Sequence, residues 1–282
     1  MTIAVTGATG QLGTHVVDAL LEKVPADQVV AVVRDAAKAQ PLADRGVTVR
    51  VASYDDRAAL ETALAGVDRV LLISGNEFGK RAEQHANVIE AAKADGVELL
   101  AYTSVLGGPA TELLVTPEHV ATEEYLAQAG LAHTLLRNGW YHENYAPAIG
   151  AAQATGTVLT AAGEGKVASA SRRDYAEAAV AVLLADDVQP VYELSGDVAW
   201  TQDDLAAAVS DVIGSPVSVT QTDEAGLKSA LEGAGVPETW ADFSAKTDTR
   251  IAAGDLAATP GELTKLIGRP TTPLVDTLRA LA

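Results

Sequence analysis

The sequence predicts an α/β protein with a doubly wound parallel sheet. Its first half alternates short β-branched and apolar runs with amphipathic helical stretches, the pattern of parallel strands covered by helices on both faces. A glycine-rich segment follows the first apolar run and opens the first helical stretch. With 282 residues, 48% of them hydrophobic, the chain is long enough for one large domain or two small ones.

Six strands are expected in the first half, separated by helices. The strands are placed at Ile3–Thr6, Val29–Val33, Val47–Val51, Arg69–Ser74, Leu99–Ser104 and Thr134–Arg137. Helices are expected at Gln11–Lys23, in the Ala-rich segment between the second and third strands, at Gln84–Ala94 and from Thr116 to Gly130. Thr116-Pro117 is a typical helix start, with Thr as the N-cap and Pro at the first helical position.

The order of elements changes after about Tyr145. Short strands then alternate with longer helices, the strands at Thr157–Leu159, Val191–Leu194 and Val217–Thr220, and the helices including Arg173–Leu184, Asp203–Val212 and Glu224–Glu232. Thr201–Asp204 and Thr259–Glu262 resemble helix starts of the capping-box type. We therefore expect residues 1–145 to form the sheet domain and residues 146–282 a smaller α/β lobe packed on it, with some interleaving of segments.

The composition excludes several classes of protein. No apolar stretch reaches the roughly 18 residues of a membrane span, and Met1–Val5 lacks the charged start of a signal peptide. The absence of Cys excludes disulfides and thiolate metal sites and is compatible with the cytoplasm, where we expect the protein. The net charge of −18 disfavours nucleic-acid binding. The five His residues form no metal motif, and the oligomeric state stays open, a homo-oligomer included.

The glycine-rich segment Gly7-Ala8-Thr9-Gly10-Gln11-Leu12-Gly13 predicts a phosphate-binding loop. Its glycines permit a tight turn, a close approach of backbone to pyrophosphate, and close packing of the helix against the strand. The helix start offers free N–H groups and the positive end of a dipole to the phosphates. The spacing is one residue wider than G-x-G-x-x-G, but the position between a strand and a helix is the expected context. Residues 1–145 are therefore interpreted as a dinucleotide-binding domain of Rossmann type.

Arg34 indicates which dinucleotide is bound. It ends the second strand about 20 residues after the loop, where an NAD-binding domain usually carries Asp or Glu for the ribose hydroxyls. A guanidinium at that place suits the 2′-phosphate of NADP instead, and Lys38 is close enough in sequence to assist. The neighbouring Asp35 is the alternative, because a rotated strand end would present its carboxylate.

The chain lacks the proton donor of a typical alcohol dehydrogenase of this fold. Those enzymes carry a Tyr and a Lys four residues apart, and none of the 7 Tyr residues here has Lys at that spacing. His119 and Glu123 occupy the corresponding places in the helix that begins at Thr116. The G-x-S-x-G motif of hydrolases and the P-loop of kinases are also absent.

Several segments carry a family likeness. The chain resembles the NmrA-like, atypical short-chain dehydrogenase/reductases, and most closely the bacterial NAD(P)H:quinone oxidoreductases of type 2. The resembling segments are Thr6–Gly13, Val32–Arg34, His85–Ile89, Ala101–Ser104, Leu136–Tyr145 and Leu266–Thr272. The segment Arg137–Tyr145 is specific to a narrow group, whereas the glycine loop is shared by the whole superfamily. Ser53 is a departure, since related sequences tend to have Asp there, near the adenine.

The resemblance implies a cofactor and its ligands. NADP(H) would be held by Arg34 and by the loop residues Gly7, Thr9, Gly10, Gln11, Leu12 and Gly13. The nicotinamide would lie near the ends of the fourth and fifth strands, at Ser74, Gly75 and Ser104. A quinone site would be walled by the C-terminal lobe and by Asn138, Gly139, Trp140, Tyr141, Asn144 and Tyr145.

The missing Tyr/Lys pair fits this chemistry. Hydride addition to a simple carbonyl gives a strongly basic alkoxide, whereas addition to a quinone gives a weakly basic hydroquinone anion that solvent can protonate. Tyr141 and His142 are the candidate proton donors within the chain. The three rings Trp140, Tyr141 and Tyr145 follow the sixth strand at the carboxyl edge, where ligands bind, or alternatively seal the joint between the lobes.

The leading interpretation is therefore an NADPH-dependent quinone reductase that works without flavin. A non-catalytic NADP(H)-sensing regulator is the alternative from another class, because NmrA-like proteins include such sensors. A reductase of triphenylmethane-type dyes is a further alternative, since a relative in the same group reduces those dyes.

Overall fold

Seven strands form one sheet, in the order β3-β2-β1-β4-β5-β6-β8, in the computed structural model, which describes residues 1–282. Five pairings along this order, from β3 through to β6, are parallel. The strands are β1 Ile3–Thr6, β2 Val29–Val33, β3 Thr48–Val51, β4 Arg69–Leu72, β5 Leu99–Val105, β6 His133–Asn138 and β8 Val191–Leu194. The chain leaves β1 toward β2 and later returns to pair β4 with β1, so the strand order reverses at β1. The predicted doubly wound α/β fold is confirmed, and its reversal point is where such sheets bind ligands.

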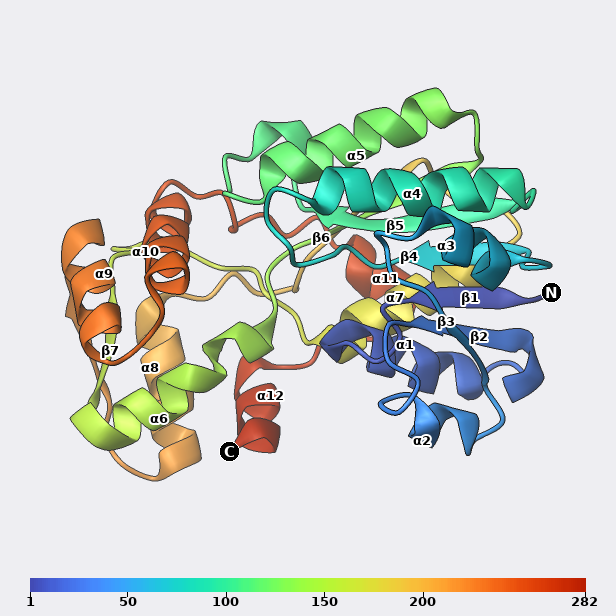
Figure 1. Ribbon diagram of the computed structural model, residues 1–282. Helices are drawn as coiled ribbons and strands as arrows, with labels where there is room; N and C mark the ends of the chain where they lie inside the picture. The colour runs from blue at the N-terminus through green and yellow to red at the C-terminus, as the bar shows by residue number, and fades with distance from the viewer. The chain divides into compact units, whose positions relative to one another are not determined.

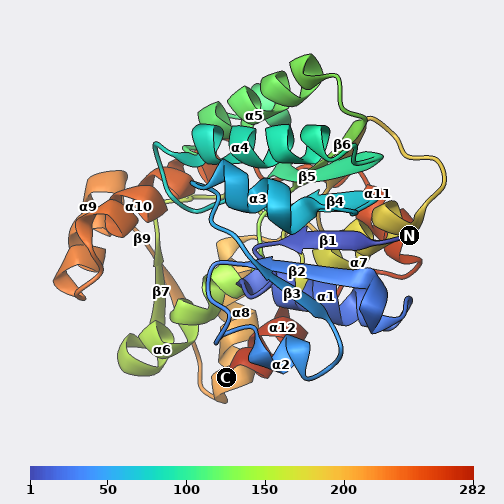
Figure 2. The ribbon, with the colours of Figure 1, turned by 45° about the vertical axis from the view of Figure 1, so that its right-hand side comes forward.

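Helices cover both faces of this sheet (Figures 1 and 2). α3 Arg57–Leu64, α4 Arg81–Ala94 and α5 Thr116–Ala129 lie over one face, and α1 Gln11–Leu21 and α7 Arg172–Leu184 pack together over the other. Every residue of β1, β2 and β5 is consequently buried. Burial on both faces explains why these strands are continuous apolar runs rather than alternating ones.

The expected Ala-rich helix between β2 and β3 is reduced to one turn, α2 at Gln40–Ala43. The carboxylate of Asp35 accepts the backbone N–H groups of Ala37 and Lys38, at 2.9 and 3.4 Å. These bonds fold the start of the segment into a turn, because Asp side chains compete with helical hydrogen bonding near the backbone. A helix is present between β2 and β3 as predicted, but it is short for this reason.

The chain divides into two compact units. The first comprises residues 1–108, 117–138 and 172–193, and the second comprises 109–116, 139–171 and 194–282. α7 and most of β8, which we expected in the second lobe, thus belong to the first unit. The physical reason is that β8 extends the main sheet beside β6 while α7 packs against α1.

The second unit contains a small parallel pair of strands and a set of helices. The strands are β7 Thr157–Thr160 and β9 Ser218–Gln221. The helices are α6 Ala146–Thr155, α8 Gln202–Ile213, α9 Glu224–Gly233, α10 Glu238–Ala252, α11 Glu262–Ile267 and α12 Leu274–Leu281. α9 packs on α10, and α8 packs on both α6 and α12.

Helix starts in this unit follow local chemistry. The capping box predicted at Thr201 is confirmed, with Thr201 and Asp204 bonding each other's backbone N–H groups. The one predicted at Thr259–Glu262 is wrong: α11 begins at Glu262 after Gly261 in the left-handed conformation, at φ 75°, with no side-chain cap. No helix of the chain combines the length and the apolarity that crossing a bilayer requires.

Candidate functional site

The loop that connects β1 to α1 has glycine at positions where a side chain would be strained or would clash with backbone. Gly7 has φ +60°, which favours glycine, and its carbonyl accepts the N–H of Gly10 at 2.8 Å. A Cβ on Gly13 would lie only 2.2 Å from the Gly7 carbonyl oxygen, and one on Gly10 would lie 3.0 Å from it. The first turn of α1 therefore packs directly against the loop, as a phosphate-binding turn requires.

The N-terminus of α1 has no partner of its own for its first N–H groups. Gly10 stands at the N-cap without a capping side chain, and the first turn holds no acidic residue. Three helices in the chain have a capping side chain, Asp56 on α3, Thr201 on α8 and Asp223 on α9. The N–H groups at Gln11, Leu12 and Gly13 and the half-buried Thr9 therefore form an uncapped helix end that fits an anion.

Arg34 follows β2 and lies 69% exposed at the loop's side of the sheet. Its Nη1 is 3.2 Å from Oε1 of Glu77, whose other oxygen lies 3.6 Å from Nζ of Lys80. Asp35, the alternative ligand, is instead engaged with the backbone N–H groups of its own turn. The strand end therefore presents a cation outward, and Lys80 adds a second one that the sequence did not indicate.

The loop after β4 is held on both sides of Gly75. The N–H of Ser74 donates to Oγ1 of Thr103 at 2.9 Å, and the N–H of Gly75 donates to Nε2 of His85 at 2.9 Å. Nε of Arg81 donates to the Gly75 carbonyl at 2.7 Å. The two candidate residues of this loop, Ser74 and Gly75, are thus fixed at the end of β4 by side chains of β5 and α4. His85 and Arg81 were missed as positioning residues, although His85 begins one of the resembling segments.

Two buried histidines lie beneath this loop in their neutral form. Because Nε2 of His85 accepts from Gly75, its proton resides on Nδ1, 3.0 Å from Oγ1 of Thr122. Burial, helped by Arg81, lowers the pKa of His85 to about 3. Burial likewise lowers the pKa of His119 to about 3, and its Nδ1 lies 2.7 Å from the hydroxyl of Tyr102. Both histidines stay uncharged at neutral pH, so neither is a cationic acid.

Ser104 belongs to a charged network where β5, α5 and β6 meet. Its Oγ donates to Oε1 of Glu123 at 2.6 Å. Arg137 holds the same carboxylate from two sides, with Nε–Oε1 at 2.9 Å and Nη2–Oε2 at 2.6 Å. Nη1 of Arg137 reaches Glu193 at 2.9 Å, and the other oxygen of Glu193 accepts the N–H of Gly107. The hydrogen bonds to Glu123 raise the pKa of Arg137 further above its ordinary value.

The aromatic segment after β6 is fastened as an extended strip of the second unit. The N–H of Gly139 donates to the Leu194 carbonyl at 2.7 Å, and Ala170 bonds the backbone of Trp140 and His142. The Trp140 ring stacks on Phe243 of α10, at 6.2 Å between centroids and 22° between planes. Phe243 in turn meets Trp240 edge-on at 5.9 Å. The sequence indicated Trp140 but neither Phe243 nor Trp240, which follow about 100 residues later in the chain.

The remaining candidates occupy different environments. His142 is buried, with Nδ1 3.1 Å from Oγ1 of Thr277, and Tyr141 is half-buried. Tyr145 packs edge-on against Trp200 at 4.7 Å, its hydroxyl is buried, and burial raises its pKa well above the ordinary value. Asn138, which is 6% exposed, has a buried Oδ1 without a hydrogen-bond partner. Asn144 is exposed.

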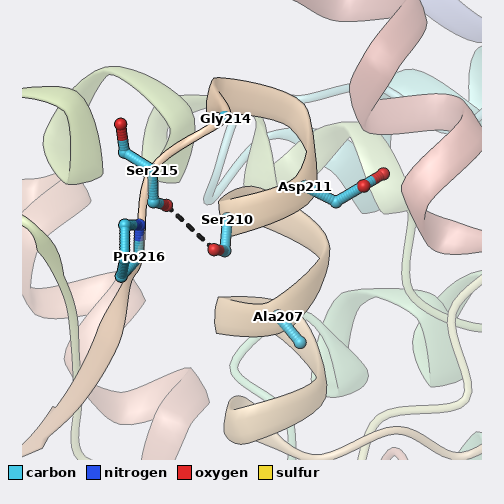
Figure 3. A pocket seen from close by; sticks show the side chains of 6 residues that line it. All are labelled: Ala207, Ser210, Asp211, Gly214, Ser215 and Pro216. Carbon is cyan, nitrogen blue, oxygen red and sulfur yellow. Dashed lines mark hydrogen bonds between the residues drawn. The ribbon is translucent and has the colours of Figure 1, made fainter.

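An open hollow of about 430 Å³ lies at the end of α8 in the second unit (Figure 3). Its lining residues are Ala207, Ser210, Asp211, Gly214, Ser215 and Pro216. Ser210 donates to the Ser215 carbonyl at 2.8 Å, and Asp211 pairs with Arg279 at 2.6 Å. The hollow is lined by none of the candidate residues. The structure also brings together no group of His, Asp and Glu that could hold a metal ion.

A glycine turn packed on an uncapped helix at the reversal point of a parallel sheet, with a cation after the second strand, defines a dinucleotide-binding α/β protein. The NmrA-like family model matches residues 1–245, and the chain belongs to the NmrA-like family.

Known relatives cover the chain from end to end. Quinone oxidoreductase 2 of Escherichia coli (strain K12) is 49% identical over 280 residues, covering 99% of this chain and 98% of the relative. The crystal structure of the E. coli NADPH-dependent quinone oxidoreductase QOR2 complexed with NADPH superposes with a TM-score of 0.96, at 99% coverage of both chains. The Citrobacter sp. triphenylmethane reductase complexed with NADP(H) has the same TM-score of 0.96 at 38% identity, with 100% of both chains covered.

Substitution of Gly13 tests whether the glycine loop is the nucleotide site. In Gly13→Ala the new methyl would lie 2.2 Å from backbone, so the helix must move away from the loop. Overpacking of this kind costs about 1–3 kcal/mol of stability. We expect NADPH affinity, measured by fluorescence titration, to fall more than about tenfold because the N–H groups move with the helix. Gly150→Ala, where a Cβ meets nothing within 4 Å, is the matched control. Unchanged NADPH affinity in Gly13→Ala would contradict the assignment.

Substitution of Arg34 tests the choice between NADPH and NADH. Arg34→Ala should remove most of the preference for NADPH while leaving NADH affinity unchanged, because only NADPH carries the 2′-phosphate. A charge-assisted contact is worth about 1.5–3 kcal/mol, and the exposure of Arg34 places the effect at the lower end, about tenfold in affinity. The control is Arg45→Ala, another exposed arginine, which pairs with Asp18. Equal affinities of the wild type for both nucleotides would disprove this role.

Proposed function

We propose that this protein is an NADPH-dependent reductase that transfers hydride from the nicotinamide directly to a quinone, without flavin. The observation that carries the proposal is the replacement of the Tyr/Lys pair. At those positions His119 is buried against Tyr102, and Glu123 is committed to Ser104 and Arg137. The end of β5 therefore offers no acid suited to a ketone. The full-length similarity to a quinone oxidoreductase points to the same class of acceptor.

The residues of the first unit fit NADP(H). The uncapped N–H groups of α1 would hold the pyrophosphate, Arg34 and Lys80 the 2′-phosphate, and Ser74, Gly75 and Ser104 the nicotinamide end. When bound, the reduced nicotinamide supplies the hydride. The protein's part is orientation, and the fixed backbone at Gly75 serves it because both polar groups of that residue are already bonded from α4.

The second unit would supply the surface for a flat acceptor. Trp140, Phe243 and Trp240 form a connected set of rings in a chain that is only 4% aromatic. Quinones are flat and apolar, and pockets for such ligands are lined by aromatic groups with few polar anchors. Asn144 of this unit and Asn138, which ends β6 in the first unit, are the proposed polar contacts, and the buried, unpartnered Oδ1 of Asn138 supports a ligand role for that residue.

Triphenylmethane-type dyes are a second candidate substrate class. The stacked pair Trp140–Phe243 suits any flat aromatic acceptor, and a cationic dye would add an attraction to the ring faces. A carbocationic dye also needs no proton after it accepts hydride, so the missing Tyr/Lys pair is compatible with this reaction as well.

An assay with purified protein and no added flavin tests the proposed reaction. The oxidation of NADPH is measured by the decrease in the absorbance of NADPH. We expect 1,4-benzoquinone to accelerate this oxidation, whereas acetone and benzaldehyde leave the rate at background. The reason is that the quinone's reduced anion needs no positioned acid, while an alkoxide does. Addition of flavin should not change the rate. If NADPH binds and neither quinones nor dyes accelerate its oxidation, the protein is a nucleotide-binding sensor instead.

The source of the proton is tested at Tyr141. His142 is buried against Thr277, so half-buried Tyr141 is the better placed of the two candidate donors. If solvent protonates the hydroquinone anion, Tyr141→Phe retains kcat within about tenfold, since a positioned acid contributes about 10²–10⁴-fold. Tyr125→Phe, which removes an exposed hydroxyl on α5, is the control. A loss of about a thousandfold with unchanged NADPH affinity would make Tyr141 the acid.

A further inference from the structure

The hydroxyl of Ser104 has its only proton committed inside the protein. It donates at 2.6 Å to Oε1 of Glu123, and a carboxylate paired with Arg137 from two sides can only accept. A serine hydroxyl has one proton and two lone pairs. Whatever else Ser104 contacts must therefore donate a hydrogen bond to it.

The network leaves Ser104 little freedom to reverse this bond. Ser104 is 5% exposed, and the side chains of Arg137 and Glu123 are 17% and 9% exposed. A Cβ on Gly108 would fall 2.3 Å from the guanidinium carbon of Arg137, so backbone closes tightly over that side chain. Glu193 holds Arg137 from its other side. Rotation of the Ser104 hydroxyl proton toward a ligand would break its hydrogen bond to Oε1 of Glu123.

We propose that Glu123 is a positioning residue that makes Ser104 a hydrogen-bond acceptor for the carboxamide N–H of the nicotinamide. The inference rests on the proposed function for placing the nicotinamide at the end of β5. A quinone or a ketone presents only acceptor oxygens, so Ser104 in this state binds neither of them. The carboxamide presents N–H donors. Ser104 thus serves the cofactor, and Glu123 removes the donor that would otherwise polarise a substrate carbonyl.

A nucleotide with the carboxamide replaced by an acetyl group distinguishes the two directions of this bond. The reduced 3-acetylpyridine analogue of NADPH keeps the carbonyl group attached to the ring but lacks the N–H groups of the carboxamide. We expect the wild type to bind it about fivefold more weakly than NADPH, the effect of one neutral hydrogen bond. In Ser104→Ala the affinity for NADPH falls by a similar factor, and the two nucleotides bind about equally.

Glu123 is tested with the same pair of nucleotides. In Glu123→Leu the acceptor is removed, Ser104 is released to donate to the acetyl carbonyl, and the ratio of the two affinities moves toward one. Glu124→Leu, at the exposed neighbouring position on α5, should keep the wild-type ratio. A general structural defect would weaken the binding of both nucleotides alike and leave the ratio at about five. If Glu123→Leu does not fold, Ser104→Ala decides alone.

Equal binding of NADPH and the acetyl analogue by the wild type would overturn the proposal, as would an unchanged ratio in Ser104→Ala. These titrations contain no acceptor, so their outcome is separate from that of the proposed reaction. A protein that discriminates between the nucleotides but reduces no quinone keeps this inference and loses the proposed function. A protein that reduces quinone but binds the two nucleotides equally keeps the proposed function and loses this inference.

Discussion

The ion pair between Glu123 and Arg137 joins more elements of the sheet domain than any other interaction described above. Through it α5 is tied to β6, Glu193 brings in β8, and Ser104 brings in β5. Both side chains are largely buried, and removal of one partner of a buried pair costs about 3–5 kcal/mol because the other charge is left uncompensated. Glu123 occupies one of the two helix positions where typical alcohol dehydrogenases of this fold carry their Tyr and Lys, so at that position a charge network has taken the place of a catalytic side chain.

The sequence was sufficient to predict the parallel strands and to single out the glycine loop and Arg34 as candidates, because each is a local pattern. β1 and β2 have the predicted bounds, since strands buried on both faces are continuous apolar runs. Errors arose where a local rule met a competing one. Asp35 turns the chain where Ala residues predict a helix, and Gly261 starts α11 without the cap that Thr259 predicts. The membership of α7 and β8 in the first unit depends on the sheet topology, and the order of elements along the sequence does not predict which strand pairs with β6.

The parts of the candidate site that were missed are all non-local. His85 and Arg81 act on Gly75 through side chains on the following helix. Phe243 stacks on Trp140 and contacts Trp240, and both Phe243 and Trp240 come from a helix that the sequence pattern did not single out. A resemblance of short segments can indicate His85 or Trp140, but only the fold shows which residues each of them contacts. Glu123 is the clearest example, because its position was noted and its role required the location of Arg137.

His85, His119 and Tyr102, near the ends of β4 and β5, have pKa values shifted away from neutral pH, so none of the three exchanges a proton with a ligand there. His85 and His119 are neutral because burial lowers their pKa values to about 3, and burial raises the pKa of Tyr102. Arg137 is held charged by two carboxylates. General acid catalysis needs a group whose pKa lies near the working pH, and this region contains no such group among these residues. A site built in this way suits an acceptor whose reduced form is stable without immediate protonation. The orientation of the Ser104 proton follows from the same preference for fixed charges, because the carboxylate of Glu123, held by Arg137, accepts it.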